Sequence, residues 1–176
     1  AKDSGFYDHE ILPVNITLPV FDESGHCDYR QTGDTTTLSI DEGYRANASI
    51  EQLGSLNSLS GIQSYLKNEI ILTAGNCCPT NDGVSACLLM SASRAKSLGI
   101  KPLAKIVTTA VAGIKPQIMG IGPVIAVKKA LTRAGLTNRD VDLIEFNEAF
   151  ASQVIATMHE LEIPHSRLNI NGGSLA

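Results

Sequence analysis

One segment, residues 142–151 (DLIEFNEAFA), most constrains how this chain folds. In it, an apolar run passes directly into a helical pattern. The run is typical of a buried strand, and it stops at Asn147, directly before a helix. Residues 169–174 (NINGGS) are typical of a second strand that runs into a glycine pair. In α/β proteins, ligands bind beside the carboxyl ends of the strands. We therefore expect a site at Asn147 and the glycines, and we expect a chain that ends at residue 176 to carry only part of it.

Strand and helix patterns alternate from residue 84 onward. Segments rich in apolar and β-branched residues predict strands, and segments with apolar residues at helical spacing predict helices between them. This order is typical of an α/β fold whose parallel strands are joined by right-handed crossovers. Thr137 and Asp140 have the spacing of a capping box. The predicted strands are 84–90, 103–112, 141–146 and 168–171, and the predicted helices are 92–98, 123–134 and 148–161.

The N-terminal half of the chain is less regular. Residues 10–21 predict two extended pieces broken by prolines, and residues 22–34 are polar and typical of a loop. Residues 49–59 predict a short helix that Ser49 caps. Residues 69–73 predict a strand. A loosely patterned start followed by strict α/β order indicates a segment from the middle of a larger protein.

Composition excludes several function classes. The net charge of −4 leaves no basic surface for nucleic acid or an anionic membrane. No apolar run approaches the ~20 residues of a membrane-spanning helix. The N-terminus lacks the pattern of a signal peptide. The four cysteines and four histidines lack the spacing of a metal site, so we expect no metal. We expect free thiols in a reducing cytoplasm, with Cys87 in a buried strand.

Asn147 has two interpretations. Asparagine is a favoured N-cap, and Asn147 directly precedes the helix predicted to begin at Glu148. Alternatively, its carboxamide faces a cleft at the strand end and orients a water molecule or a substrate carbonyl group. The residues alone leave both interpretations open. The apolar stripe of the following helix predicts core positions, with the first of them at the cleft end: Phe150, Val154, Met158 and Leu161.

Two further loops have the composition of a ligand site. Residues 113–123 contain glycines, which let a backbone approach a ligand closely, and Met119 would be an apolar wall. This loop lacks the third glycine of a dinucleotide-binding fingerprint. Residues 73–83 are rich in small and amide side chains, which suit a site wall and a surface turn equally. Cys77 or Cys78 is a weak candidate nucleophile, because neither has an obvious base beside it.

Taken together, these segments resemble the thiolase family, the CoA-dependent 3-ketoacyl thiolases and acetyl-CoA acetyltransferases. Their order and spacing match that family, and NEAFA followed by NxNGG is the most characteristic pair. Residues 1–34 match only loosely. The matching segments are 41–45 (DEGYR), 73–76 with 81–83 (TAGN and NDG), Gly113 with Pro116 and 119–123 (MGIGP), 147–151 (NEAFA) and 169–173 (NINGG).

The resemblance implies a layered α-β-α fold, only partly present, and covalent catalysis. In that family a cysteine nucleophile takes the acyl group from acyl-CoA, and a second cysteine acts as acid and base. A histidine of a GHP motif and a water molecule held by the asparagine of NEAF form an oxyanion hole. By position, Asn147 would hold that water.

The resemblance also implies substrate-binding residues. Coenzyme A and acyl-CoA are then substrates, and no cofactor stays bound permanently. Position 78 is usually serine in the family and is cysteine here, which puts the usual hydroxyl contact in question. The expected binding residues are Arg45 near the nucleotide end of coenzyme A, Ala74 and Cys78 near its pantetheine, and Met119 and Phe150 along the acyl and pantetheine pocket.

The same resemblance predicts three parts. Residues 1–83 would be the remainder of a CoA-binding loop domain, 84–100 the last strand and helix of the N-terminal thiolase domain, and 101–176 the first half of the C-terminal domain. The segment between residues 59 and 73 is a few residues longer than usual. The nucleophilic cysteine, the GHP histidine and the acid/base cysteine are missing here. We therefore expect a parent acyltransferase of fatty-acid metabolism and an inactive fragment.

Two alternatives remain open from the sequence. The protein could be a non-catalytic thiolase-like protein that binds acyl-CoA, or another condensing enzyme of the fold, such as a ketoacyl synthase. A homo-oligomer is implied by the resemblance. A partial sheet would expose apolar faces, so we also expect the fragment to associate.

Overall fold

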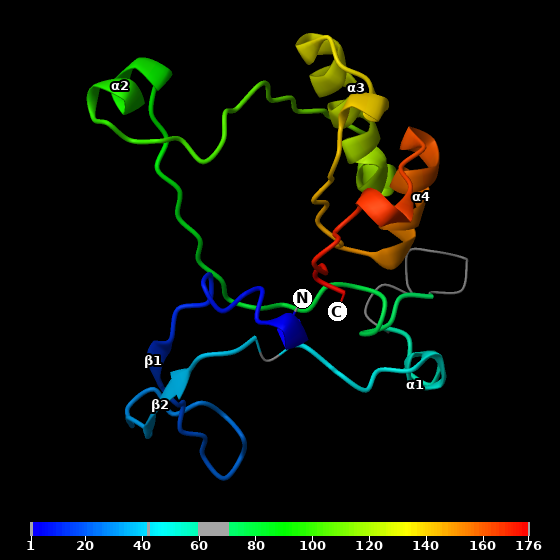
Figure 1. Cartoon of the computed structure of the whole chain (residues 1–176). Coiled ribbons are helices and arrows are strands. Elements are labelled where there is room, and N and C mark those ends of the chain that lie inside the picture. The colour runs from blue at the N-terminus through cyan, green and yellow to red at the C-terminus, as the bar shows by residue number, and fades with distance from the viewer. Residues whose placement is uncertain (1, 42, 60–70, 176) are drawn as a thin grey trace. The chain divides into compact units, whose positions relative to one another are not determined.

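The computed structural model describes residues 2–41, 43–59 and 71–175 (Figure 1). These residues form two compact units, of which the first ends at Asn47 and the second runs from Ala48 to Leu175. The start of the strand predicted at 69–73 and most of the longer segment between residues 59 and 73 lie outside the described residues.

The first unit is built around a two-stranded antiparallel hairpin. After a 3-10 turn, η1 (Lys2–Ser4), strand β1 (Val14–Thr17) pairs with β2 (Thr35–Leu38). Their β-branched residues favour extended backbone, which explains why these pieces pair although they are short. Residues 22–34 are a loop between them, as predicted. Its turn is held by Asp22, whose carboxylate accepts two backbone N–H groups.

Local capping signals set the helix boundaries of the second unit. Ser49 and Gln52 form a reciprocal capping box at the first helix, which is shorter than the sequence predicts. The predicted capping box of Thr137 and Asp140 is present. Gly135 ends a helix with φ 68°, a left-handed conformation that suits glycine. The elements are α1 (Ile50–Gly54), α2 (Ala92–Ser97), η3 (Pro116–Ile121), α3 (Gly122–Ala134), η4 (Asn138–Asp140), α4 (Ala151–Leu161) and η5 (His165–Arg167).

The core of the second unit lies between α3 and α4, which contact each other (Figure 1). The apolar stripe predicted for α4 is confirmed as core, since Val154 and Leu161 are buried and Met158 packs against them. Each buried aliphatic side chain contributes about 1.5–3 kcal/mol. Residues before α3 and after α4 complete this hydrophobic cluster. Its buried members are Val124, Val154, Leu161, Ile163 and Leu168.

The predicted parallel sheet is largely absent from the described residues. Residues 84–90 and 103–112 are extended but belong to no ladder, and the predictions at 141–146 and 168–171 reduce to one parallel bridge between Ile144 and Leu168. A strand requires a second strand that pairs with its backbone, and within the described ranges residues 84–90 and 103–112 have no such partner. The strand predictions are therefore wrong for this chain as it stands.

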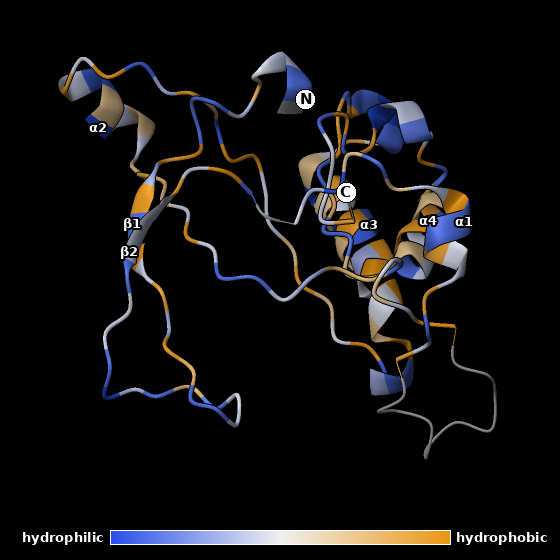
Figure 2. Ribbon diagram, turned by 90° about the horizontal axis from the view of Figure 1, so that it is seen from below, coloured by the Kyte–Doolittle hydropathy of each residue, from blue (hydrophilic) through white to orange (hydrophobic). Residues whose placement is uncertain are grey.

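The unpaired extended segments expose apolar side chains, as expected for a partial sheet. Val84 and Leu103 are fully exposed. Orange, apolar stretches lie along the ribbon outside the helices in Figure 2. Cys87 is exposed, so its predicted burial is wrong, because residues 84–90 do not pair into a sheet that would bury it. Among the described residues, no helix has both the length and the apolar character needed to cross a bilayer.

Candidate functional site

Two loops far apart in the sequence pair through their backbones. Cys77 and Phe150 form an antiparallel bridge. The backbone N–H of Cys78 donates to the carbonyl oxygen of Ala149 at 3.0 Å, and that of Ala151 donates to Asn76 at 2.9 Å. The structure therefore joins the TAGN loop to the NEAFA loop, two segments that sequence analysis singled out separately.

The TAGN loop is held in shape by the side chain of Asn76. Its amide oxygen accepts the N–H of Thr73 at 2.8 Å, and its NH₂ group donates to the carbonyl of Ile71 at 2.8 Å. This brace leaves Ala74 exposed on the turn. The two cysteines that follow differ in environment. The Cys77 thiol is half-buried and donates to the Thr73 carbonyl, whereas the Cys78 thiol is exposed. Neither cysteine forms a disulfide.

A second junction joins the NEAFA loop to the glycine segment through Asn169. The Asn169 side chain accepts the N–H of Phe146 at 2.7 Å and donates to its carbonyl at 2.9 Å. The same NH₂ group donates to the carboxylate of Glu148 at 2.6 Å. Glu148 also accepts the N–H of Leu175 at 3.0 Å, and its backbone carbonyl accepts the hydroxyl of Ser174. We call this set of residues, Phe146, Glu148, Asn169, Ser174 and Leu175, the loop clasp.

Each glycine of the pair is required for a different reason. Gly172 has φ 101°, which only glycine adopts without strain. Gly173 lies directly beneath the Glu148 carboxylate, and a Cβ atom there would collide with that group. The NGG sequence thus lets the backbone turn and lets the carboxylate approach.

Asn147 lies in the middle of the clasped segment with an exposed side chain. Helix α4 begins at Ala151 and its N-cap is Phe150, so the interpretation of Asn147 as an N-cap is wrong. The reason is that Ala149 and Ala151 use their backbone groups to pair with the TAGN loop. Within the described chain, the structure gives the Asn147 carboxamide no hydrogen-bond partner, so its donors and acceptor face outward.

The glycine-rich loop 113–121 contacts helix α4. A Cβ atom on Gly120 would meet the side chain of Gln153 at 3.2 Å, so the two backbones approach closely. Met119 is 70% exposed, and Phe150 is half-buried. Arg45 belongs to the first unit, where its side chain is exposed.

The second unit therefore brings together the loops that carry Asn147, Phe150, Ala74 and Cys78, and it places the loop of Met119 against α4. The sequence motifs did not indicate the roles of Glu148 and Asn169. The available signal was Asn169 itself, because asparagine tolerates the left-handed conformation that it adopts there, with φ 45°. In the described ranges no cluster of three or more metal-binding side chains occurs.

The perturbed carboxyl groups lie outside these loops. Hydrogen bonds from Thr137 lower the pKa of Asp140. A backbone hydrogen bond and the Ser49 side chain lower the pKa of Glu51. Both carboxylates are exposed and sit at helix starts, where negative charge is favoured. Their pKa shifts therefore reflect capping and not catalysis.

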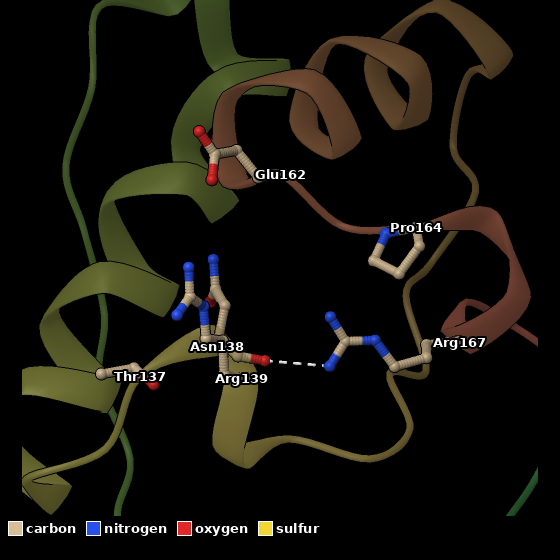
Figure 3. Close-up of a pocket in the computed structure, with 6 residues that line it drawn as sticks. All are labelled: Thr137, Asn138, Arg139, Glu162, Pro164 and Arg167. Atoms are coloured by element: carbon tan, nitrogen blue, oxygen red, sulfur yellow. Dashed lines mark hydrogen bonds between the residues drawn. The ribbon is translucent and has the colours of Figure 1, made fainter.

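A hollow of about 630 Å³ opens between η4 and the segment after α4 (Figure 3). The Arg167 guanidinium donates to the backbone carbonyls of Asn138 at 3.0 Å and Val141 at 2.5 Å. Arg167 is thus occupied in tying these segments together. The hollow contains none of the predicted site residues; it is lined by Thr137, Asn138, Arg139, Glu162, Pro164 and Arg167.

Two family profiles match the chain along most of its length. The profile of the thiolase N-terminal domain matches residues 1–93, and that of the thiolase C-terminal domain matches residues 100–176. The chain belongs to the thiolase family. The chain is 39% identical over 176 residues to a probable acetyl-CoA acyltransferase of Staphylococcus epidermidis, of which it covers 40%.

Solved structures show the same fold. The acetyl-CoA acetyltransferase of Bacillus anthracis matches 99% of the chain with a TM-score of 0.82 and 36% identity, over 40% of its own length. The dimeric peroxisomal thiolase of Saccharomyces cerevisiae matches 100% of the chain with a TM-score of 0.81 and 33% identity, over 39% of its own length. The extended segments therefore follow the path of a thiolase, and the chain spans about 40% of the relatives that it matches.

Proposed function

We propose that this chain is part of an acyl-CoA C-acyltransferase that condenses acyl-CoA units or cleaves a 3-ketoacyl-CoA with coenzyme A. The observation that carries the proposal is the joining of three separate motif loops by hydrogen bonds. Residues 76–78 pair with 149–151, and 146–148 are clasped by 169–175. Membership of the thiolase family supports the same reaction class.

Asn147 is the residue that we assign to the chemistry. A carboxamide donates and accepts hydrogen bonds, so it can hold a water molecule whose proton points at a thioester oxygen. That oxygen gains negative charge when an enolate or tetrahedral intermediate forms. A donor aimed at such an oxygen typically contributes about 10²–10³ in kcat. The exposed, unpartnered carboxamide, in a loop that is hydrogen-bonded on both sides, suits this role.

The remaining proposed residues bind substrate. Met119 and Phe150 offer apolar surface for the acyl chain and pantetheine. Ala74 and Cys78 lie on the paired loop, where exposed small side chains leave room for a pantetheine arm. Arg45 would bind the nucleotide phosphates, since a guanidinium forms bidentate bonds with phosphate oxygens. Coenzyme A is the cosubstrate, with no permanently bound cofactor.

The whole protein is proposed to extend beyond this chain. Residues 1–83, 84–100 and 101–176 would be the end of the CoA-binding loop domain, the end of the N-terminal domain and half of the C-terminal domain. The nucleophilic cysteine, the oxyanion-hole histidine and the acid/base cysteine are proposed to lie outside these residues. A homo-oligomer is supported by the dimeric yeast neighbour. Free thiols suit the reducing cytoplasm, where we place the protein in fatty-acid metabolism.

The test is thiolysis of 3-ketoacyl-CoA of increasing chain length by the full-length protein. We expect turnover, and we expect Asn147→Ala to lower kcat by roughly 100-fold. Asn57→Ala, an exposed asparagine in another loop, is the matched control and should leave kcat unchanged. Turnover by the 176-residue chain alone would contradict the assignment of the missing residues. Binding of acyl-CoA by the full-length protein without turnover would favour a non-catalytic thiolase-like protein.

A further inference from the structure

The segment around Asn147 is fixed on both sides by residues of the glycine segment. On its N-terminal side, both backbone polar groups of Phe146 bond to the side chain of Asn169, at 2.7 and 2.9 Å. On its C-terminal side, the Glu148 carboxylate accepts from Asn169 at 2.6 Å and from Leu175 at 3.0 Å. The two residues that flank Asn147, Phe146 and Glu148, are therefore both hydrogen-bonded to the glycine segment.

The side chain of Asn169 makes the hydrogen bonds that a paired strand backbone would otherwise make. The backbone pairing of the two segments runs through Ile144, whose N–H donates to Arg167 and whose carbonyl accepts from Asn169. Beyond that bridge Asn169 turns left-handed, with φ 45°, and backbone pairing stops. Its side chain then presents one acceptor and one donor to Phe146, which continues the pairing by two more hydrogen bonds.

The Glu148 carboxylate extends this contact to the backbone after the glycines. Hydrogen bonds to an ionised acceptor are shorter and stronger than those between neutral groups. Both of its oxygens have donors from the glycine segment, and Gly173 lacks the Cβ that would displace it. The carboxylate thus fixes the distance between the backbone of residues 173–175 and the loop that carries Asn147.

We propose that Glu148 and Asn169 are positioning residues that aim the Asn147 carboxamide and fix the backbone at residues 173–175 beside it. Neither residue touches the reacting atoms in this assignment. The proposal rests on the proposed function, because aiming Asn147 matters only if its carboxamide holds the oxyanion-hole water. A misplacement of a polarising group by a fraction of an ångström lowers the rate of chemistry and leaves substrate affinity largely unchanged.

The experiment is a double-mutant cycle in the full-length protein. Asn169→Asp keeps the side-chain shape and the tolerance for left-handed backbone but replaces the NH₂ group that donates to the Glu148 carboxylate and to the Phe146 carbonyl with an acceptor. Glu148→Gln keeps the shape and turns one acceptor into a donor. Each single variant should lower kcat by roughly 10- to 100-fold with KM for acyl-CoA within about threefold. The double variant restores a donor–acceptor pair, so its kcat should exceed that of Asn169→Asp.

Controls separate positioning from general damage. Glu160→Gln and Asn57→Asp make the same chemical changes at exposed positions and should leave kcat unchanged. Circular dichroism establishes that each variant is folded. Should a single variant unfold, the double variant decides: a folded and active double supports the proposal, and an unfolded one overturns it. Folded single variants with kcat within twofold of the wild type overturn it as well.

A second readout keeps the proposal distinct from the proposed function. Hydrogen exchange of the Leu175 amide reports its bond to Glu148 whether or not the protein turns over. Exchange should become faster in Glu148→Gln and stay unchanged in Glu160→Gln. An inactive wild-type protein would refute the proposed function. In that case an unchanged Leu175 exchange rate in Glu148→Gln would overturn the clasp too.

Discussion

Replacement of Gly173 by alanine should open the loop clasp. The new methyl group would occupy the place of the Glu148 carboxylate, so the carboxylate must turn away. It would lose its bonds to Asn169 at 2.6 Å and to Leu175 at 3.0 Å. Hydrogen bonds to a charged group contribute about 1.5–3 kcal/mol each, and the freed carboxylate regains water, so we expect a loss of about 3 kcal/mol.

Hydrogen exchange of the Leu175 amide in the intact protein measures this loss directly. A fall of 3 kcal/mol in the free energy of local opening corresponds to exchange roughly 100-fold faster. Gly113→Ala is the matched control, because a Cβ atom there meets nothing within 4 Å. Adding Gly173→Ala to Glu148→Ala should cost little more than Glu148→Ala alone. Equal exchange rates in Gly173→Ala and Gly113→Ala would refute the reasoning.

Two further predictions concern stability. Leu161→Ala should lower the free energy of unfolding by about 3 kcal/mol, because Leu161 is 2% exposed in the core. Ile155→Ala, on the exposed face of α4, should lower it far less. Similar urea midpoints for the two variants would contradict this prediction. The pKa of Asp140 is lowered in the folded protein, so its stabilisation is present above the unfolded-state pKa and is lost as pH falls through the folded-state pKa. Asp140→Asn should weaken the acid dependence of unfolding measured below neutral pH, and an unchanged acid dependence would contradict the assignment of that capping box.

The sequence predicted the helices well and the strands poorly, for a physical reason. Helix ends depend on residues three or four positions apart, such as Ser49 with Gln52 or Thr137 with Asp140, and these signals are local. A strand depends on a neighbour that pairs with it. The apolar, β-branched residues of 84–90 and 103–112 favour strands, but within the described chain no second strand pairs with them.

The candidate site was predicted as a set of motifs and not as a set of contacts. The NEAFA and NxNGG segments were recognisable, and the structure brings them together with the TAGN loop. The N-cap interpretation of Asn147 failed because pairing across the chain, from Asn76 to Ala151, overrides the local preference for a helix start. The role of Glu148 was not predictable, since it depends on Gly173, which is close in space but distant in sequence.

The two junctions of the site close loops of different length. The shorter loop should therefore form first during folding. The bond between Phe146 and Asn169 spans 23 positions. The pairing of Asn76 with Ala151 encloses roughly 75, and closing the larger loop costs about 1 kcal/mol more in chain entropy. We therefore expect the clasp to assemble early during folding and the TAGN loop to dock late. Until it docks, the Cys78 amide lacks its partner at Ala149, so during refolding it should gain protection from hydrogen exchange later than the Phe146 amide.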